Sequence, residues 1–510
     1  MIPLLILAAT VVMTSVLTSL HLYSQWKFTY WQKRGVPQLN PIFLYGDCKD
    51  LVKGNKSLAE YALENYKKFK AMGVPYGGIY IALRGILVPI APELIKDIMN
   101  KNFECFTAHF SKRPKKINRI LNKNLFNIEG EAWRATRKKL TPTFTSGKMK
   151  MMFETLLEKT QGLEQLAGKI AESGKPADIR DVLARFTTDV VASCGFGLEC
   201  NSLKDSKSEF LEHGRLIFTP PKIKDHILRI LLKALHFVSP QNYQVSEDFF
   251  RQVVGETIEY REKNKIHRKD FLHMMIQLKN RGVVDDDINV FDHSAKSDGT
   301  FDLDDVTAQC LIFFLAGFET SATAMTFALL ELCEHPEIQA KVRQEAEEVL
   351  NKYNGRMTYE AMLELKYTEQ VIEETMRKYP PVGVIPRVCT KKYTIPGTKT
   401  EIEPGTMVHI SAWGLHTDPE YFPNPQKFDP ERFTVENRRN IKEFTYLPFG
   451  EGPRMCLGLR FGLMQSKVGL VSLLKNYKFT LNEKTRLPLK MARTVITCVD
   501  GDVWVNIEKI

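Results

Sequence analysis

The chain has 510 residues, and 71 lysines and arginines against 60 aspartates and glutamates give a formal net charge of +11. Hydrophobic residues make up 44% of the chain and charged residues 26%, which excludes collagen, low-complexity and wholly disordered proteins. Nine scattered cysteines without a C-x-x-C pair argue against a disulfide framework, a zinc finger or an iron–sulfur site, and they indicate reduced thiols. The basic excess fits a membrane surface or an acidic protein partner; since no nucleic-acid-binding motif accompanies it, we expect no nucleic-acid partner.

The chain starts with an apolar run that carries no charge. Residues 2–23 would span about 33 Å as a helix, enough to cross the hydrocarbon core of a bilayer. Trp26 belongs to an aromatic cluster after the run, and Lys27 and Lys33 precede the first acidic residue. This order is typical of a single-pass anchor whose following domain faces the cytosol. A cleavable signal peptide is the alternative, but Met1–Pro3 lacks the basic residue that such a peptide needs.

The rest of the chain predicts one large domain, mainly α with a smaller β part. We expect the anchor at 1–24, a basic, proline-rich linker at 25–44 and the domain at 45–510. The expected elements are, in order, a hairpin at 77–90; amphipathic helices near 93–102, 131–140, 146–173, 245–264 and 358–379; a surface loop at 281–302; a long apolar helix over 305–333; strands within 392–412; proline-rich coil over 418–449; and a helix from about 456.

The first candidate site residues are Trp133 and Arg137, which lie four residues apart in a predicted helix. This spacing places them on one face, so the indole N–H and the guanidinium can reach one anion. For a tryptophan taken alone, packing in the core is the ordinary role.

A second candidate site lies inside the long apolar helix, in the segment Ala316-Gly-Phe-Glu-Thr320. Glu319 is costly in such surroundings unless it is paired, and Gly317 costs about 1 kcal/mol relative to alanine in a helix interior. Gly317 would open a shallow groove for a diatomic ligand, and Thr320 can bond back to the carbonyl of Ala316. A core helix with a packing glycine is the alternative.

Glu374 and Arg377 are three residues apart on a predicted helix, so their charges share one face. As an exposed pair they would contribute only a few tenths of a kcal/mol to stability, about the value of a surface salt bridge.

The strongest local signal is the loop Phe449-Gly-Glu-Gly-Pro-Arg-Met-Cys456-Leu-Gly458. It predicts a cysteine held by a stiff loop before a helix, where free backbone N–H groups and the helix dipole favour the thiolate. Gly452 would permit a positive φ, and Gly458 would permit the close approach of a flat, bulky group. Arg454 supplies a fork-shaped cation for a carboxylate on such a group.

This loop, F-x-x-G-x-R-x-C-x-G, resembles the haem-thiolate loop of the cytochrome P-450 family. The family's other motifs follow in order along the chain, as W-x-x-x-R at Trp133, A-G-x-[DE]-T at Ala316, E-x-x-R at Glu374 and P-E-R-F at 430–433. The resemblance covers essentially the whole chain after the anchor and implies the cytochrome P-450 fold. The stretches 141–153, 414–419 and 446–462 resemble insect-type microsomal members.

The resemblance implies a role for each candidate residue. Cys456 is the implied axial ligand to the iron of haem b, where a thiolate favours O–O cleavage. Thr320 and Glu319 are implied to guide protons to dioxygen, with Ala316 and Gly317 over the haem. Other implied haem contacts are Trp133, Arg137, Arg387 and Arg454 at the propionates, and Phe449 and Gly458 in the loop. Glu374, Arg377 and Arg432 are implied to form a buried scaffold.

The implied reaction is the insertion of one oxygen atom from O2 into a lipophilic molecule, xenobiotic or endogenous. Electrons come from NADPH through a partner flavoprotein, an acidic NADPH-cytochrome reductase, and a cytochrome b-type donor is a second candidate partner. We expect docking on bases near the cysteine loop, namely Arg137, Lys138, Lys139, Arg460 and Lys467. The implied location is the endoplasmic reticulum membrane, with the catalytic domain in the cytosol.

Three other functions stay open at this stage. His416 and Asp418 have the H-x-D spacing of a non-haem iron site, although no β-barrel pattern surrounds them. An isomerase or dehydratase of the same fold would need no reductase; such enzymes often lack the acid–threonine pair that Glu319 and Thr320 supply. A non-catalytic haem or ligand carrier would consume no NADPH.

The substrate itself does not follow from the sequence. The segments expected to line the pocket are 104–125, parts of 210–245, Phe313–Thr320, Val382–Ile385 and Thr494–Thr497, and they are mostly apolar. For Phe313 and Phe314, packing in the core is the alternative. The basic pairs at 112–113 and 115–116 either tune access for anionic substrates or lie at the membrane surface.

Overall fold

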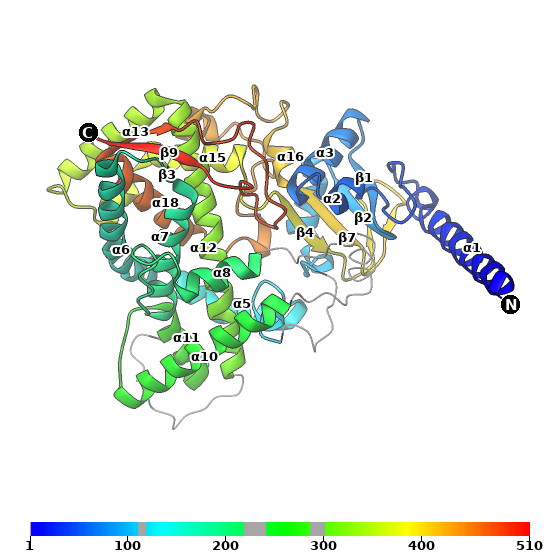
Figure 1. Ribbon diagram of the computed structural model, residues 1–510, viewed down its shortest axis with the longest axis horizontal. Helices are drawn as coiled ribbons and strands as arrows, with labels where there is room; N and C mark the ends of the chain where they lie inside the picture. The colour runs from blue at the N-terminus through cyan, green and yellow to red at the C-terminus, as the bar shows by residue number, and fades with distance from the viewer. Residues whose placement is uncertain (1, 111–118, 219–240, 286–300) are drawn as a thin grey trace.

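A computed structural model describes residues 2–510 except 111–118, 219–240 and 286–300 (Figure 1). The basic pairs at 112–116 and part of the expected pocket lining lie outside the described residues. Helices dominate the described chain and three small sheets complete it, so the prediction of a mainly α fold with a smaller β part is confirmed.

The predicted helical segments are helical, although the one expected near 358–379 is divided into two helices at Leu365. The described helices outnumber the predicted ones. They are α1 Ile2–Lys27, α2 Lys49–Lys53, α3 Leu58–Ala71, α4 Pro92–Lys96, α5 Gly130–Leu140, α6 Ser146–Ser173, α7 Ile179–Phe196, α8 Glu209–Phe218, α10 Gln241–Asn264, α11 Phe271–Arg281, α12 Leu303–Glu334, α13 Pro336–Lys352, α14 Tyr359–Glu364, α15 Lys366–Lys378, α16 Ala412–His416, α17 Val435–Arg438 and α18 Leu459–Leu474. The expected coil over 418–449 contains the short helix α17 and a 3₁₀ turn at Pro430–Phe433.

The strands form sheets of four, three and two members. The four-stranded sheet has the order β1 (Tyr76–Ile81), β2 (Arg84–Pro89), β7 (Met407–Ser411) and β4 (Val384–Val388). β1 and β2 are the predicted hairpin, β2 and β7 run parallel, and β4 and β7 run antiparallel. The three-stranded sheet joins β3 (Ala177–Asp178), β9 (Trp504–Lys509) and β8 (Tyr477–Leu481), and β5 (Tyr393–Thr394) pairs with β6 (Glu401–Ile402).

Helix α12 runs through the middle of the helical half, packed against α7 and α18 (Figure 1). Its start is fixed by a capping box, in which Asp302 accepts from the Asp305 N–H and Asp305 accepts from the Asp302 N–H. It is apolar and long enough to cross a membrane, but most of it is buried inside the protein, so it is a core helix.

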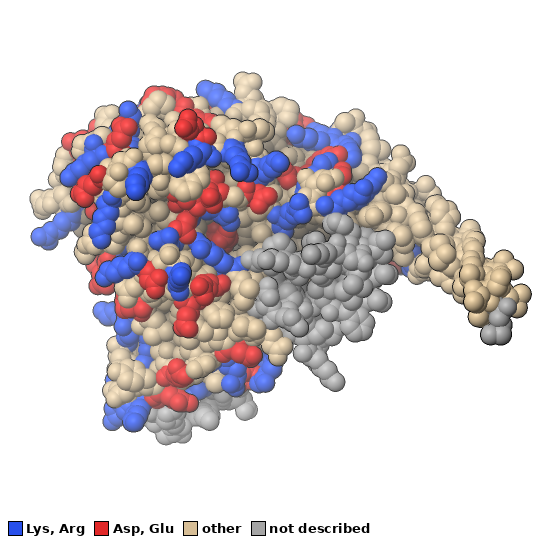
Figure 2. All heavy atoms as spheres, viewed as in Figure 1, with Lys and Arg blue, Asp and Glu red and all other residues tan. Residues whose placement is uncertain are grey.

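Helix α1 projects from the side of the four-stranded sheet (Figure 1) and is the predicted anchor. No part of its apolar window is buried in the protein, and Figure 2 shows it as a rod almost without charged side chains. Since so much apolar surface cannot remain in water, α1 is a candidate membrane span.

The segment after α1, which was expected as a linker, packs against the sheet through Trp31. This side chain is fully buried, and its Nε1 donates to the carbonyl oxygen of Ile79 at 3.2 Å. A Cβ on Gly78 would lie 2.3 Å from the indole ring, so only glycine leaves room for it. The anchor therefore joins the domain through a packed contact.

Candidate active site

The cysteine loop adopts the tight form that its glycines predict. The Cys456 N–H donates to the Phe449 carbonyl oxygen at 2.9 Å, which closes the loop. Gly452 has φ +74°, and a Cβ there would lie 2.1 Å from the Met99 carbonyl oxygen. No other residue fits this position without displacing the backbone. Helix α18 begins three residues after the cysteine, with Gly458 at its N-cap.

Cys456 keeps exposed surface at the end of the loop. The other eight cysteines are buried or half-buried. Yet burial among protein atoms raises the pKa of the Cys456 thiol, opposed by the Gly458 N–H and the positive charge of Arg137. A cysteine that faces an open space inside the protein would have both exposed surface and a thiol pKa raised by burial. A Cβ on Gly458 would contact only the Phe144 ring among the described residues, at 3.9 Å, so this glycine borders open space.

Helix α12 also presents exposed surface, at Ala316. This residue is exposed although Leu315 and Phe318 beside it are buried. The Thr320 hydroxyl donates to the Ala316 carbonyl oxygen at 2.5 Å, the back-bond that the sequence predicts. Gly317 has a packing reason that the sequence does not reveal, because a Cβ there would lie 2.9 Å from a methyl group of Val191 on α7.

Glu319 is buried in α12, and it is paired. Arg180, in the first turn of α7, donates from Nη2 to Glu319 Oε1 at 3.4 Å. Arg180 lies 139 residues earlier in the chain, and no motif marks it.

Phe313 and Phe314 pack in the core of the protein, the alternative to lining the substrate pocket. Phe314 is fully buried and stacks on Phe318, and Phe313 stacks on Phe271 of α11 at 4.7 Å between ring centroids. Among the residues of this helix named as pocket lining, Ala316 is the exposed one.

The four predicted carboxylate ligands include buried arginines without an acidic partner in the described chain. Arg387 is fully buried, its Nη1 donates to the Pro386 carbonyl oxygen at 2.9 Å, and its Nε has no partner among the described residues. The Arg454 Nε is likewise unpartnered. Burial lowers the pKa of Arg387 to about 10 and that of Arg454 to about 9, the latter helped by the positive charge of Arg387.

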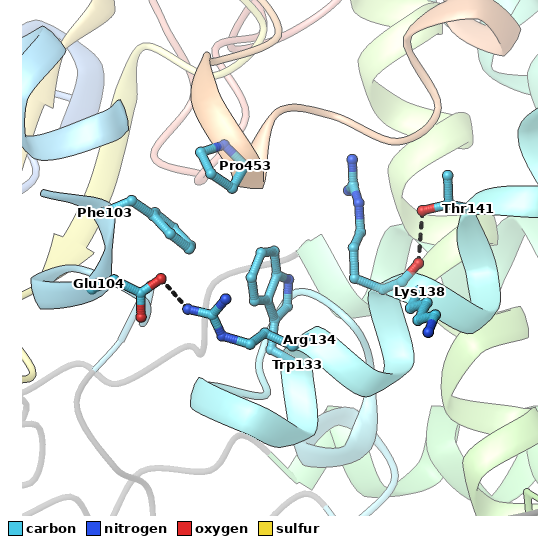
Figure 3. Close-up of a pocket in the computed structure, with 8 residues that line it drawn as sticks. Phe103, Glu104, Trp133, Arg134, Lys138, Thr141 and Pro453 are labelled. Carbon is cyan, nitrogen blue, oxygen red and sulfur yellow. Dashed lines mark hydrogen bonds and ion pairs between the residues drawn. The ribbon is translucent and has the colours of Figure 1, made fainter. Parts of the chain in front are cut away.

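Trp133 and Arg137 lie beside a cavity of about 320 Å³ between α5 and the cysteine loop (Figure 3). The Arg454 guanidinium stacks over the Trp133 ring at 4.8 Å. Phe103 also contacts this ring, with centroids 5.3 Å apart. Burial lowers the pKa of Arg137, and the charge of Cys456 opposes that shift, which places Arg137 within electrostatic reach of the sulfur. Glu104 on the cavity wall is already paired with Arg134, so the donors of Trp133, Arg137 and Arg454 fit a group that carries carboxylates.

Sequence reasoning missed His109 in this cluster. Its Nδ1 lies 2.8 Å from Arg454 Nη1, and its ring packs on Phe126. Burial and the charges of Arg387 and Arg454 hold the pKa of this histidine well below its usual range, so it is neutral. No spacing motif marked it, because the contact joins residues far apart in sequence.

Glu374, Arg377 and Arg432 meet in the interior. The first two are completely buried and share two hydrogen bonds of 2.7 and 2.8 Å, and Arg432 Nε lies 3.5 Å from Glu374 Oε1. Arg377 also donates to the His416 carbonyl oxygen at 2.9 Å, and the Asp429 N–H donates to Glu374 at 3.0 Å. The cluster therefore ties α15 to the chain that leads to the cysteine loop.

The alternative iron site at His416 and Asp418 is wrong. His416 accepts from the Leu447 N–H through Nε2, whereas Asp418 pairs with Lys70 at 2.9 Å and accepts from the Tyr66 hydroxyl. Among the residues that the structure describes, no three His, Cys, Asp or Glu side chains gather to hold a metal ion.

One of the predicted docking residues is also wrong. Lys467 is buried on α18 and pairs with Glu369 at 2.6 Å, so it cannot contact a partner protein. Lys138 and Arg460 are exposed, and Lys139 lies over the Phe301 ring.

Comparison with known proteins identifies the class to which this fold and site belong. A model of the cytochrome P450 family matches residues 37–501. Cytochrome P450 6k1 of Blattella germanica is 36% identical over 494 residues, which cover 95% of this chain and 93% of the relative. Probable cytochrome P450 6a23 of Drosophila melanogaster is 38% identical over 501 residues (94% and 95%), and cytochrome P450 6A1 of Musca domestica 36% over 509 residues (97% of each).

The protein is therefore a haem-dependent monooxygenase. More particularly, the chain belongs to the cytochrome P450 family, and its relatives are insect members of types 6 and 9. The family binds haem and receives electrons from NADPH through a reductase partner. Nothing in the comparisons favours the isomerase alternative.

Proposed function

We propose that Cys456 is the axial ligand of the haem iron and that the haem lies between it and Ala316. The observation that carries this proposal is an exposed cysteine in a tight glycine-rich loop at the start of α18, with a thiol pKa that burial raises and the positive charge of Arg137 lowers. Haem, when bound, supplies the iron that activates dioxygen. The Cys456 thiolate would donate electron density to that metal, and the Gly458 N–H and Arg137 favour its negative charge. Phe449 and Gly458 form the floor of the site.

On the opposite side, Thr320 and Glu319 are the proposed proton-handling residues. The Thr320 hydroxyl donates its hydrogen bond to the Ala316 carbonyl oxygen, at the exposed position of α12. Glu319, the next residue in the chain, is a buried acid that can resupply that proton. Ala316 and Gly317 form the wall of α12 beside which dioxygen would lie.

Trp133, Arg137, Arg387 and Arg454 are the proposed ligands of the haem carboxylates. Buried cations without counter-ions destabilise a protein unless an anion joins them, so the unpartnered atoms of Arg387 and Arg454 point to an anionic ligand. Glu374, Arg377 and Arg432 form the proposed scaffold beneath, and they take no part in the chemistry.

Replacing Arg387 by methionine tests this assignment. One lost charged hydrogen bond weakens binding by about 1.5–3 kcal/mol, so haem transfer to excess apomyoglobin should become about 10- to 100-fold faster. The haem-free protein should be equally or more stable, because a buried unpaired charge is removed. Arg343→Met is the control, since Arg343 bonds the carbonyls of Leu474 and Tyr477 elsewhere. An unchanged transfer rate for Arg387→Met would contradict the assignment.

We further propose that the protein is a single-pass protein of the endoplasmic reticulum membrane with its catalytic domain in the cytosol. The bases after α1 support this orientation. The lipophilic substrates of the family can reach the domain from the membrane; which molecule is oxidised stays open.

The cavity face around α5 is the proposed docking site of the acidic NADPH-cytochrome reductase, and a cytochrome b-type donor could use the same face. Lys138 is exposed at its rim, Arg137 lines it, and Glu104 pairs with Arg134 there (Figure 3). Cationic side chains on this face would steer an acidic partner toward the cysteine loop.

A charge reversal at Lys138 tests the docking site. Lys138→Glu should lower reductase-supported turnover at low salt by about fivefold, the effect of roughly 1 kcal/mol of lost electrostatic attraction, and high salt should shrink the difference. Lys169→Glu is the matched control, because Lys169 is exposed near the far end of α6, about 35 Å along that helix. Equal turnover of the two variants at every salt concentration would rule this face out.

A further inference from the structure

The buried acid of α12 has a partner that no motif marks, Arg180. Its backbone lies in the first turn of α7, where the Asp178 carboxylate accepts the Arg180 N–H at 3.1 Å. The same carboxylate accepts the Val503 N–H at 3.0 Å, beside the pairing of β3 with β9. The position of Arg180 is therefore fixed against the C-terminal chain.

The guanidinium of Arg180 spans the gap between α12 and that C-terminal chain. Nη2 donates to Glu319 Oε1 at 3.4 Å and lies 3.7 Å from the Cys498 sulfur. Nη1 donates to the Gly501 carbonyl oxygen at 3.2 Å. One cation on α7 thus contacts two other parts of the fold, α12 and residues 498–501.

The chemistry around Glu319 makes this contact necessary. Among the residues that the structure describes, Arg180 and Cys498 are the charged or titratable groups in contact with the carboxylate. The thiol of Cys498 is buried and its pKa is raised, chiefly by burial, so the thiol is neutral. Compensation of a negative charge at this place in α12 therefore depends on Arg180.

The ion pair between Arg180 and Glu319 is long and monodentate. A bidentate arginine would occupy both carboxylate oxygens, whereas here one N–H reaches one oxygen. Arg180 therefore leaves the second carboxylate oxygen of Glu319 available, as a group that exchanges protons requires.

We infer that Arg180 is a positioning residue for Glu319: it keeps the carboxylate ionised within the apolar helix and straps residues 498–501 to the same point. The inference deepens the proposed function, because it assigns the control of the acid beside Thr320 to a residue on another helix. The strap also joins this acid to the C-terminal segment whose residues 494–497 are expected to line the substrate pocket.

The first test reads the charge of Glu319 directly. The infrared difference between the protein and Glu319→Gln isolates the carboxyl bands of Glu319, and the same difference is then taken in an Arg180→Met background. We expect an ionised carboxylate at neutral pH in the native background and in Arg180→Lys, and a protonated carboxyl in Arg180→Met. An ionised band in Arg180→Met would overturn the inference.

The second test separates the strap from the ion pair by hydrogen exchange in the full chain. Arg180→Met should speed exchange of the amides at 498–503 by at least tenfold, because the bond to Gly501 is lost. Glu319→Gln should leave them unchanged. Arg185→Met is the matched control, since Arg185 lies on the same helix and pairs with Asp181 instead. Equal exchange in Arg180→Met and Arg185→Met would refute the strap.

These results can be told apart from a failure of the proposed function. If Arg180→Met does not fold, the double variant Arg180→Met/Glu319→Gln replaces it in the exchange experiment, because this variant removes both charges. The infrared experiment then uses Arg180→Lys. If Glu319→Gln itself does not change proton delivery, the proposed role of Glu319 fails while the measurements on Arg180 still decide its contacts.

Discussion

Replacing Cys456 by alanine should abolish the red-shifted Soret band of the reduced carbon monoxide complex and reduce monooxygenase turnover to background. The reason is that only a thiolate at this position donates enough electron density to produce that band and to favour O–O cleavage. The measurement is an absorption spectrum of the reduced, carbon monoxide-treated protein, followed by turnover with the reductase.

Cys333→Ser is the control for this experiment. Cys333 is half-buried in the last turn of α12, and burial raises the pKa of its thiol. Its loss should change neither the spectrum nor turnover. Should Cys456→Ala keep the native spectrum, the ligand would be another residue.

Replacing Glu374 by glutamine should destabilise the protein by about 3–5 kcal/mol, the usual cost of breaking a buried ion pair by removing one partner. Arg377 is completely buried and the Arg432 side chain is 15% exposed, and both would keep their charge without Glu374 as counter-ion. Burial raises the pKa of Glu374, and the bond to Arg377 opposes that shift. Chemical denaturation of the full chain in detergent measures the loss.

A surface pair gives the comparison. Glu364 is 3.1 Å from Lys352, and both side chains are largely exposed. Glu364→Gln should cost less than about 1 kcal/mol, because water and salt screen an exposed pair. If both variants lost the same small amount, Glu374 would not be a scaffold residue.

The elements with strong local patterns were predictable from the sequence. The hairpin at 77–90 and the helices α5, α6 and α12 lie where hydrophobic periodicity places them. The glycine at 452 was predictable as well, since its positive φ is a backbone demand that only glycine meets easily.

Contacts between distant parts of the chain were not predictable. Arg180 and His109 carry no local pattern, and their roles appear only when the fold brings α7 to α12 and residue 109 to Arg454. Trp31 belongs to the aromatic cluster expected at the membrane interface, and that prediction is wrong for it, because the fold buries it against the sheet. Lys467 shows the opposite error. Its charge suggested an exposed face, but Glu369 compensates it in the interior.

X-ray absorption at the iron edge of the purified ferric protein shows directly whether Cys456 binds the haem iron. We expect one sulfur atom in the first coordination shell of the iron, together with the porphyrin nitrogens. That sulfur should be absent from Cys456→Ala. A native first shell of nitrogen and oxygen only would contradict it.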